Sequence, residues 1–252
     1  MSRFRTLVRL LALAMVCGPL LARAAEPARN YLWTATTLRA APGALKAVIA
    51  DLKALKAQGY YGKAGRTPPL ILRHSQGDQW DVLLLEPIGS YSAYFAPGRL
   101  HRQNKADTDF AERLQHLQAR IAFEETLFAF GPAPDHVRAY VQGARFFHIE
   151  MFNALPGKKQ ALLREREMEN AYLEATKRRG NLIFSGDQGS DVDSFTIGAY
   201  PSLATFAARP DLPPDAFDAA ARAAGFADGD SIGFYLRSLI AAHHDTLANL
   251  VD

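Results

Sequence analysis

One short stretch, residues 146–151, carries the side chains most suited to chemistry. In a strand, alternation places His148 and Glu150 on one face together with Phe146, and the intervening apolar residues on the other face. A histidine and a carboxylate so spaced can form a proton-transfer pair or supply two metal ligands. The alternative without chemistry is a buried, hydrogen-bonded pair that fixes the register of the strand.

A second group of ionisable residues lies near the C-terminus. Apolar residues between Leu236 and Leu250 recur with helical spacing and predict a final helix, with His243 inside its apolar stripe and His244 on its flank. Glu124 lies beside a similar stripe, made by Leu117, Ile121 and Phe128, in the equivalent helix predicted for the first half. We expect these groups to close the ends of a barrel or to line an entrance. Adjacent histidines on a helix diverge by about 100°, which disfavours one metal held by both.

The segment 164–172 is dense in charges of both signs. Its i,i+4 pairs include Glu165 with Glu169, which repel, and few that attract. The pattern is typical of a solvated helix face, and it also allows an interaction surface.

The elements that must position these residues occur twice, as a repeat in the sequence. Pro42-Gly43 and Pro156-Gly157 lie 156 − 42 = 114 positions apart, and Gln76-Gly77 is repeated as Gln188-Gly189. So long a period indicates two duplicated units related by a pseudo-twofold axis. Each unit is predicted as β-α-β-β-α, an α+β arrangement with helices on one face of an antiparallel sheet.

The first strand of the first unit is predicted over 31–38. Its Thr34 and Thr36 match His148 and Glu150, so we expect a polar quartet facing the interior of a barrel, with Trp33 nearby. The apolar face of 146–151 is then expected beneath the helices. A fourth strand is unclear: residues 126–130 suit one in the first unit, whereas 246–251 look helical.

With this element order the chain resembles the dimeric α/β-barrel superfamily, which includes antibiotic-biosynthesis-type monooxygenases, NIPSNAP-like proteins, chlorite dismutases and dye-decolourising peroxidases. The resemblance covers most of the mature sequence and is closest in kind to NIPSNAP-like proteins of unknown function. It implies two tandem ferredoxin-like units, packed sheet to sheet as a single-chain pseudo-dimeric barrel. Predicted boundaries are 1–24 for a signal peptide, 25–143 for the first repeat and 144–252 for the second.

The leader is predicted from a basic start, an apolar stretch from Leu10 to Leu21 and the cleavage site Ala22-Arg23-Ala24. This predicts bacterial export to the periplasm or beyond, with no integral membrane segment after cleavage. The formal charge of +3 becomes 3 − 4 = −1 once four leader arginines are removed, which gives no electrostatic case for nucleic acid. The one cysteine, Cys17, also lies in the leader, so no disulfide is expected.

Three functions fit these patterns. The first is binding of a small, mostly apolar ligand in the barrel interior or the cleft between repeats, lined by Trp33, Phe146, His148 and Glu150. The second is a cofactor-independent monooxygenase or isomerase, with His148 as base and Glu150 orienting it. The third is a structural or assembly protein with a filled barrel. No metal or other cofactor is predicted, although the pattern leaves haem and metal open, and the oligomeric state cannot be read from the sequence.

Overall fold

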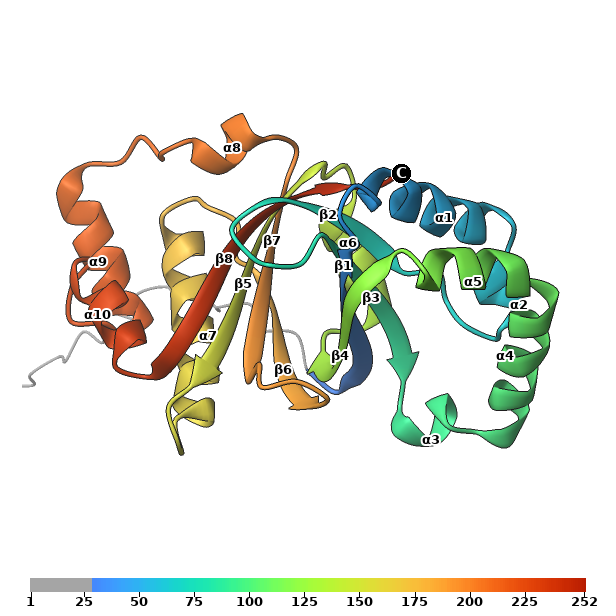
Figure 1. Cartoon of the computed structure of the whole chain (residues 1–252). Helices are drawn as coiled ribbons and strands as arrows, with labels where there is room; N and C mark the ends of the chain where they lie inside the picture. The colour runs from blue at the N-terminus through green and yellow to red at the C-terminus, as the bar shows by residue number, and fades with distance from the viewer. Residues whose placement is uncertain (1–28) are drawn as a thin grey trace, which may run out of the picture.

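The computed structural model describes residues 29–252, so the predicted leader lies outside the described residues. Eight antiparallel strands close into a barrel in the order β1-β3-β2-β8-β5-β7-β6-β4. In Figure 1 helices α1 to α5 of the first unit lie on the right, α6 overlaps the strands in the middle, and α7 to α10 lie on the left. Helices therefore cover the barrel from outside. None of the helices in the described part is both long and apolar enough to cross a bilayer.

The first unit supplies four strands in the order β4-β1-β3-β2. They are β1 (Tyr31–Ala40), β2 (Leu70–Gln76), β3 (Val82–Gly89) and β4 (Ile121–Gly131). Its helices are α1 (Leu45–Ala57), α2 (Tyr60–Lys63), α3 (Tyr91–Tyr94), α4 (Pro97–Asp109), α5 (Ala111–Gln118) and α6 (Pro134–Val141).

The second unit repeats this arrangement in the order β8-β5-β7-β6. Its strands are β5 (Phe146–Ala154), β6 (Leu182–Gln188), β7 (Ser194–Tyr200) and β8 (Ile240–Leu250). Its helices are α7 (Lys159–Ala175), α8 (Leu203–Ala207), α9 (Pro214–Ala224) and α10 (Ser231–Arg237). The α+β pseudo-dimeric barrel predicted from the sequence is therefore present, and each unit has the fourth strand that completes a ferredoxin-like fold.

The repeated Gln-Gly pairs explain how the two units join. Gly77 and Gly189 follow β2 and β6, with φ of +122° and +93°. A Cβ at Gly77 would lie 1.9 Å from the backbone oxygen of Asp245, and one at Gly189 would lie 2.1 Å from that of Thr126. Each hairpin thus lies against the fourth strand of the other unit, where β2 pairs with β8 and β6 pairs with β4. Only glycine fits these two positions.

The inside of the barrel is packed with apolar side chains from both units. Trp33 of β1, Phe147 of β5 and Phe195 of β7 belong to one buried cluster, in which Trp33 also meets Phe184 edge to face. The expected orientation of β5 was therefore wrong. Phe147, Ile149 and Met151 point into the barrel, whereas His148, Glu150 and Phe152 point outward to α7. Alternation defines two faces but not which one is inside, and the larger apolar set fills the barrel.

The final helix predicted from the sequence was also wrong, as was the helix through 121. Helix α10 ends at Arg237 and helix α5 ends at Gln118. After each of them the chain continues as a long strand. His243 and His244 therefore occupy β8 and point to opposite faces of the sheet. Strand register sets Glu124 opposite Leu38 and His243 opposite Phe152, so Glu124 corresponds to His243 in the repeat, one position from the match made by sequence.

Candidate functional site

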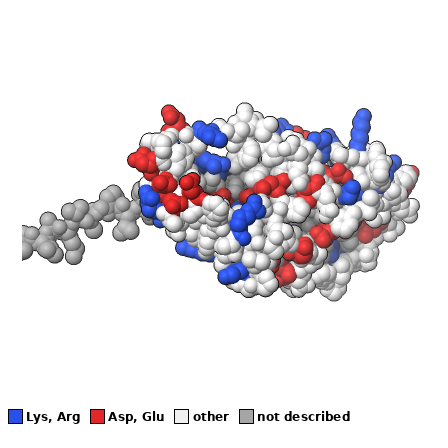
Figure 2. All heavy atoms as spheres, turned by 60° about the vertical axis from the view of Figure 1, so that its left-hand side comes forward, with Lys and Arg blue, Asp and Glu red and all other residues white. Residues whose placement is uncertain are grey.

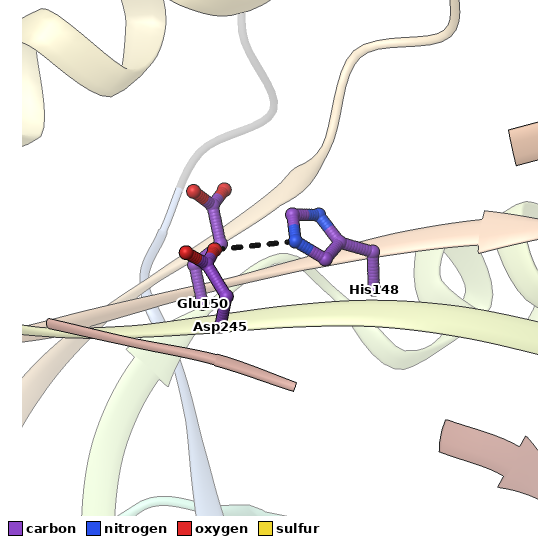
Figure 3. Close-up of side chains that lie close together, drawn as sticks. All are labelled: His148, Glu150 and Asp245. Atoms are coloured by element: carbon purple, nitrogen blue, oxygen red, sulfur yellow. Dashed lines mark ion pairs between the residues drawn. The ribbon is translucent and has the colours of Figure 1, made fainter. Parts of the chain in front are cut away.

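Three ionisable side chains meet on the outer face of the second unit, beneath α7. Glu150 of β5 lies directly opposite Asp245 of β8 in the strand register. His148 Nε2 lies 3.3 Å from Asp245 Oδ1 (Figure 3). His148 is mostly buried, whereas the Asp245 side chain is 53% exposed. This edge of the group is therefore open to solvent.

Asp245 is shared by two histidines. Its second oxygen, Oδ2, lies 3.0 Å from His243 Nε2. The His243 ring is stacked parallel to Phe152 at a centroid distance of 5.9 Å, and its Nδ1 lies 2.7 Å from Arg237 Nη1. Asp245 thereby fixes the position of both imidazole rings.

Glu150 is fixed from the other side. Thr196 of β7 donates a hydrogen bond of 3.0 Å to Glu150 Oε2, and Arg166 Nη1 lies 3.6 Å from the same oxygen. Since His148 and Glu150 also lie on one strand, three strands and α7 together define the geometry.

Arg166 is the buried cation of this layer. Its guanidinium donates two hydrogen bonds, of 2.6 and 2.8 Å, to Glu165, and its Nη1 lies 2.6 Å from Glu169 Oε2. It also lies 4.7 Å above the Phe152 ring. The Arg166 and Glu165 side chains are 1% and 0% exposed. The solvated face predicted for 164–172 is therefore wrong at these two residues, which α7 turns toward the sheet.

The corresponding positions of the first unit hold uncharged residues. Thr34 corresponds to His148, and Thr36 and Thr126 correspond to Glu150 and Asp245. The two threonine hydroxyls share a hydrogen bond of 2.8 Å. Helices α1 and α7 begin 159 − 45 = 114 positions apart, so fully buried Leu52 corresponds to Arg166.

The charged residues of the second unit are not needed for the fold. The first unit packs the same sheet and helix with hydroxyls and a leucine, so the fold does not require charge at these positions. In the second unit two carboxylates face each other on neighbouring strands, an arrangement that costs stability. Three carboxylates, Glu150, Glu165 and Glu169, lie within 3.6 Å of the buried Arg166 guanidinium, and Asp245 lies opposite Glu150. Costly buried charge of this kind is typical of functional sites.

The electrostatics of the group move its pKa values apart. Burial lowers the pKa of His148, but the hydrogen bond to Asp245 and the charge of Glu150 outweigh burial, so the net shift is upward. The hydrogen bond to His148 lowers the pKa of Asp245. Burial and then the charge of Glu169 raise the pKa of Glu150, and burial raises the pKa of Glu165 to about 7. An ionised acid beside a histidine and a second, less acidic carboxyl are suited to proton transfer.

The same three residues meet the distance requirement for a metal site. His148, Glu150 and Asp245 each offer one ligand atom, and these atoms lie within 4.8 Å of one another. However, the Arg166 guanidinium lies next to Glu150 Oε2 and places a positive charge at the edge of the triad. Asp245 is also already held by two imidazoles. The arrangement therefore favours proton transfer over binding of a divalent cation.

Sequence reasoning brought some of these residues together and missed others. Phe146 and His148 share one face of β5, as predicted, although that face points outward. Both rings contact Phe206 of α8, at 5.6 and 5.1 Å between centroids. The partners of His148 and Glu150 in Asp245 and Arg166 were not predicted. Comparing position 166 with position 52 across the 114-residue repeat would have found Arg166, since it places an arginine where the other unit has a buried leucine.

The remaining predicted residues lie elsewhere. Trp33 is inside the barrel, where its indole N–H donates to the oxygen of Pro132. Thr34, Thr36 and Glu124 line a separate cavity of about 190 Å³ in the first unit. His244 lies on the other face of β8, with its Nδ1 3.5 Å from Asp78 Oδ1. Their roles in ligand binding stay predictions.

Comparison with known proteins shows the fold. No protein-family model and no curated protein matches the sequence. Among solved structures, an anthrone oxidase-like protein superposes with a TM-score of 0.57 at 13% identity, over 88% of this chain and 92% of that one. A chlorite dismutase variant from Candidatus Nitrospira defluvii gives a TM-score of 0.46 at 10% identity, over 89% and 93% of the two chains. The first of these likenesses extends the shared architecture over both units of this chain.

Proposed function

We propose that the protein is an enzyme that removes a proton from a small carbon acid, with His148 as the general base. The observation that supports this most strongly is the His148–Asp245 pair, placed where the other unit has Thr34 and Thr126. Proton abstraction is the step common to isomerases and cofactor-independent oxygenases, the reaction classes suggested by the sequence.

The geometry assigns each group a role. Asp245 accepts from His148 Nε2, which leaves the lone pair of the neutral imidazole on Nδ1 for the substrate proton. Asp245, rather than Glu150, is therefore the residue that orients the base. Glu150 lies on the same strand as the base, and its negative charge adds to the effect of Asp245 in raising the pKa of His148 against burial.

Ligand binding belongs to this proposal, but in a different place from the one expected. The barrel interior is filled by the apolar cluster around Trp33 and Phe147, so we place the ligand between the sheet and the helices of the second unit. Membership of the NIPSNAP-like group and export through the leader also stay proposals, supported by the sequence patterns alone.

The test is solvent deuterium exchange, which requires no knowledge of the later steps. Anthrone, chosen because the solved structure reported above is described as anthrone oxidase-like, and 2-naphthylpyruvate both carry acidic methylene protons. We expect the protein to accelerate deuterium uptake at these carbons in D2O, measured by mass spectrometry. Exchange no faster than in buffer for both compounds would contradict the proposal. A loss of exchange on dialysis against EDTA, restored by Zn²⁺, would identify the triad as a metal site instead.

The pH dependence tests the assignment of His148. Because its pKa is raised and only the neutral imidazole is a base, kcat/KM for exchange is expected to rise with pH through a midpoint above the ordinary histidine value of about 6.5. In Asp245→Asn the charge that raises this pKa is removed, so the midpoint moves down. The same midpoint in both proteins would contradict the pairing of Asp245 with His148.

A further inference from the structure

A cavity of about 370 Å³ adjoins the candidate site in the second unit. Its walls come from the residues after α7, the end of β7 and the segment that carries α8. Phe206 is common to the cavity and the site, because its ring contacts His148 at 5.1 Å and it also lines the cavity. A molecule in this cavity therefore contacts the same aromatic ring as the proposed base.

The cavity is strongly cationic. Lys177, Arg178, Arg179 and Arg209 line it, and no acidic residue does. Arg179 is occupied, since it donates to the backbone oxygen of Tyr140 and lies 3.7 Å above the Tyr140 ring. Within residues 29–252, by contrast, no carboxylate is paired with the side chain of Lys177, Arg178 or Arg209.

The position of these residues after the end of α7 explains only part of the positive charge of the cavity. Cations after the end of α7 interact favourably with the helix dipole, which accounts for Lys177 and Arg178 as surface residues. It does not account for Arg209, which arrives from the segment after α8. Lys177 also has φ +59° and is the only non-glycine residue of the described part with positive φ. A left-handed residue that ends a helix is usually glycine, so a lysine there is retained at a conformational cost.

The other walls are aromatic. Tyr200 and Phe206 meet edge to face at 5.2 Å, and both line the cavity. Such walls suit a flat apolar body, while unpaired guanidinium groups suit a carboxylate or a phosphate. The volume lies near the lower end of the range of about 300–1,000 Å³ that is usual for ligand pockets.

We propose that this cavity binds the anionic group of the substrate, which is a flat aromatic molecule carrying a carboxylate or a similar anion. This inference rests on the proposed function. Charge sets the orientation of such a molecule: Lys177, Arg178 and Arg209 attract the anion, while Glu150, Glu169 and Asp245 repel it. In Figure 2, which turns this side forward, acidic side chains form a band with basic side chains beside it. The uncharged end of the substrate is thereby directed to His148.

Isothermal titration with 1-naphthoate tests the proposal, with 1-naphthalenemethanol as the uncharged molecule of the same shape. We expect naphthoate to bind more tightly than the alcohol, and its Kd to rise with added salt. Arg178→Gln and Arg209→Gln should each raise the naphthoate Kd roughly tenfold, the order expected for one charge-assisted hydrogen bond. Arg102→Gln is the matched control, since Arg102 lines a cavity of about 630 Å³ in the first unit.

Equal affinity for the acid and the alcohol would overturn the proposal, as would an equal loss in Arg102→Gln. Inorganic phosphate that binds as tightly as naphthoate would overturn the aromatic part of it. His148→Gln should lose catalysed exchange and keep naphthoate binding, which separates this inference from the proposed function. In the wild-type protein, naphthoate binding without any catalysed exchange supports the cavity and contradicts the enzyme, whereas exchange without naphthoate binding does the reverse.

Discussion

Replacing His148 with glutamine is expected to lower the rate of catalysed deuterium exchange by a factor of roughly 10²–10⁴, the usual contribution of a positioned general base. Glutamine keeps a hydrogen-bond donor for Asp245 but has no basic nitrogen. The substitution therefore removes the base and leaves the surrounding contacts in place. Exchange would be measured by mass spectrometry on the same two carbon acids.

The matched control for this variant is Thr34→Val. Thr34 occupies the corresponding position of the first unit and is buried. It should leave exchange unchanged, and both variants should keep the wild-type melting temperature. Exchange that is equally slowed in the two variants would place the activity outside the second unit, and unchanged exchange in His148→Gln would exclude His148 as the base.

Arg166→Leu is expected to cost about 3–5 kcal/mol of unfolding free energy at neutral pH, the usual effect of removing one partner from a buried ion pair. Leucine fits the space, because Leu52 fills the same position in the first unit. The loss arises because Glu165, Glu169 and Glu150 are left without their counter-charge. Urea unfolding would measure it.

The pH dependence of this loss gives a second check. Without Arg166 the pKa values of the buried carboxyls in the folded protein lie further above their unfolded values, and such groups lose stability as the pH rises. The deficit of Arg166→Leu should therefore shrink as the pH is lowered toward 5. Arg164→Leu is the control on the same helix. Its side chain is 64% exposed, so its effect should stay within about 0.5 kcal/mol. Equal losses in the two variants would show that the buried network contributes nothing specific.

The barrel itself could be predicted from the sequence because duplication leaves a long-range signal. Pro-Gly and Gln-Gly pairs recur at equivalent turns, and two half-buried sheets must cover each other. The fourth strand of the second unit was missed for a local reason, whereas that of the first was predicted over part of its length, 126–130. Residues 240–250 contain alanine and leucine, which favour helix, and pairing with β5 overrides that preference. The sequence pattern within 240–250 does not indicate that this segment pairs with a distant strand.

The candidate site was predicted in part. The pairing of His148 and Glu150 on one face follows from strand alternation alone. Their outward direction does not, since it depends on which face fills the closed barrel. Asp245 fell within the predicted final helix, so sequence reasoning did not place it beside β5. The charged pattern of 164–172 predicted a solvated Arg166, although the apolar Leu52 at the equivalent position of the repeat indicated that this position is buried.

The most direct test of the account is the triple variant His148→Thr, Glu150→Thr and Asp245→Thr, which gives the second unit the three residues of the first. If the charged layer serves chemistry and not folding, this protein folds with an unfolding free energy equal to or above that of wild type, and its catalysed exchange is abolished. Arg166 keeps Glu165 and Glu169 as partners, so no buried cation is left unpaired. A variant that loses several kcal/mol of stability, or one that still catalyses exchange, would contradict the account.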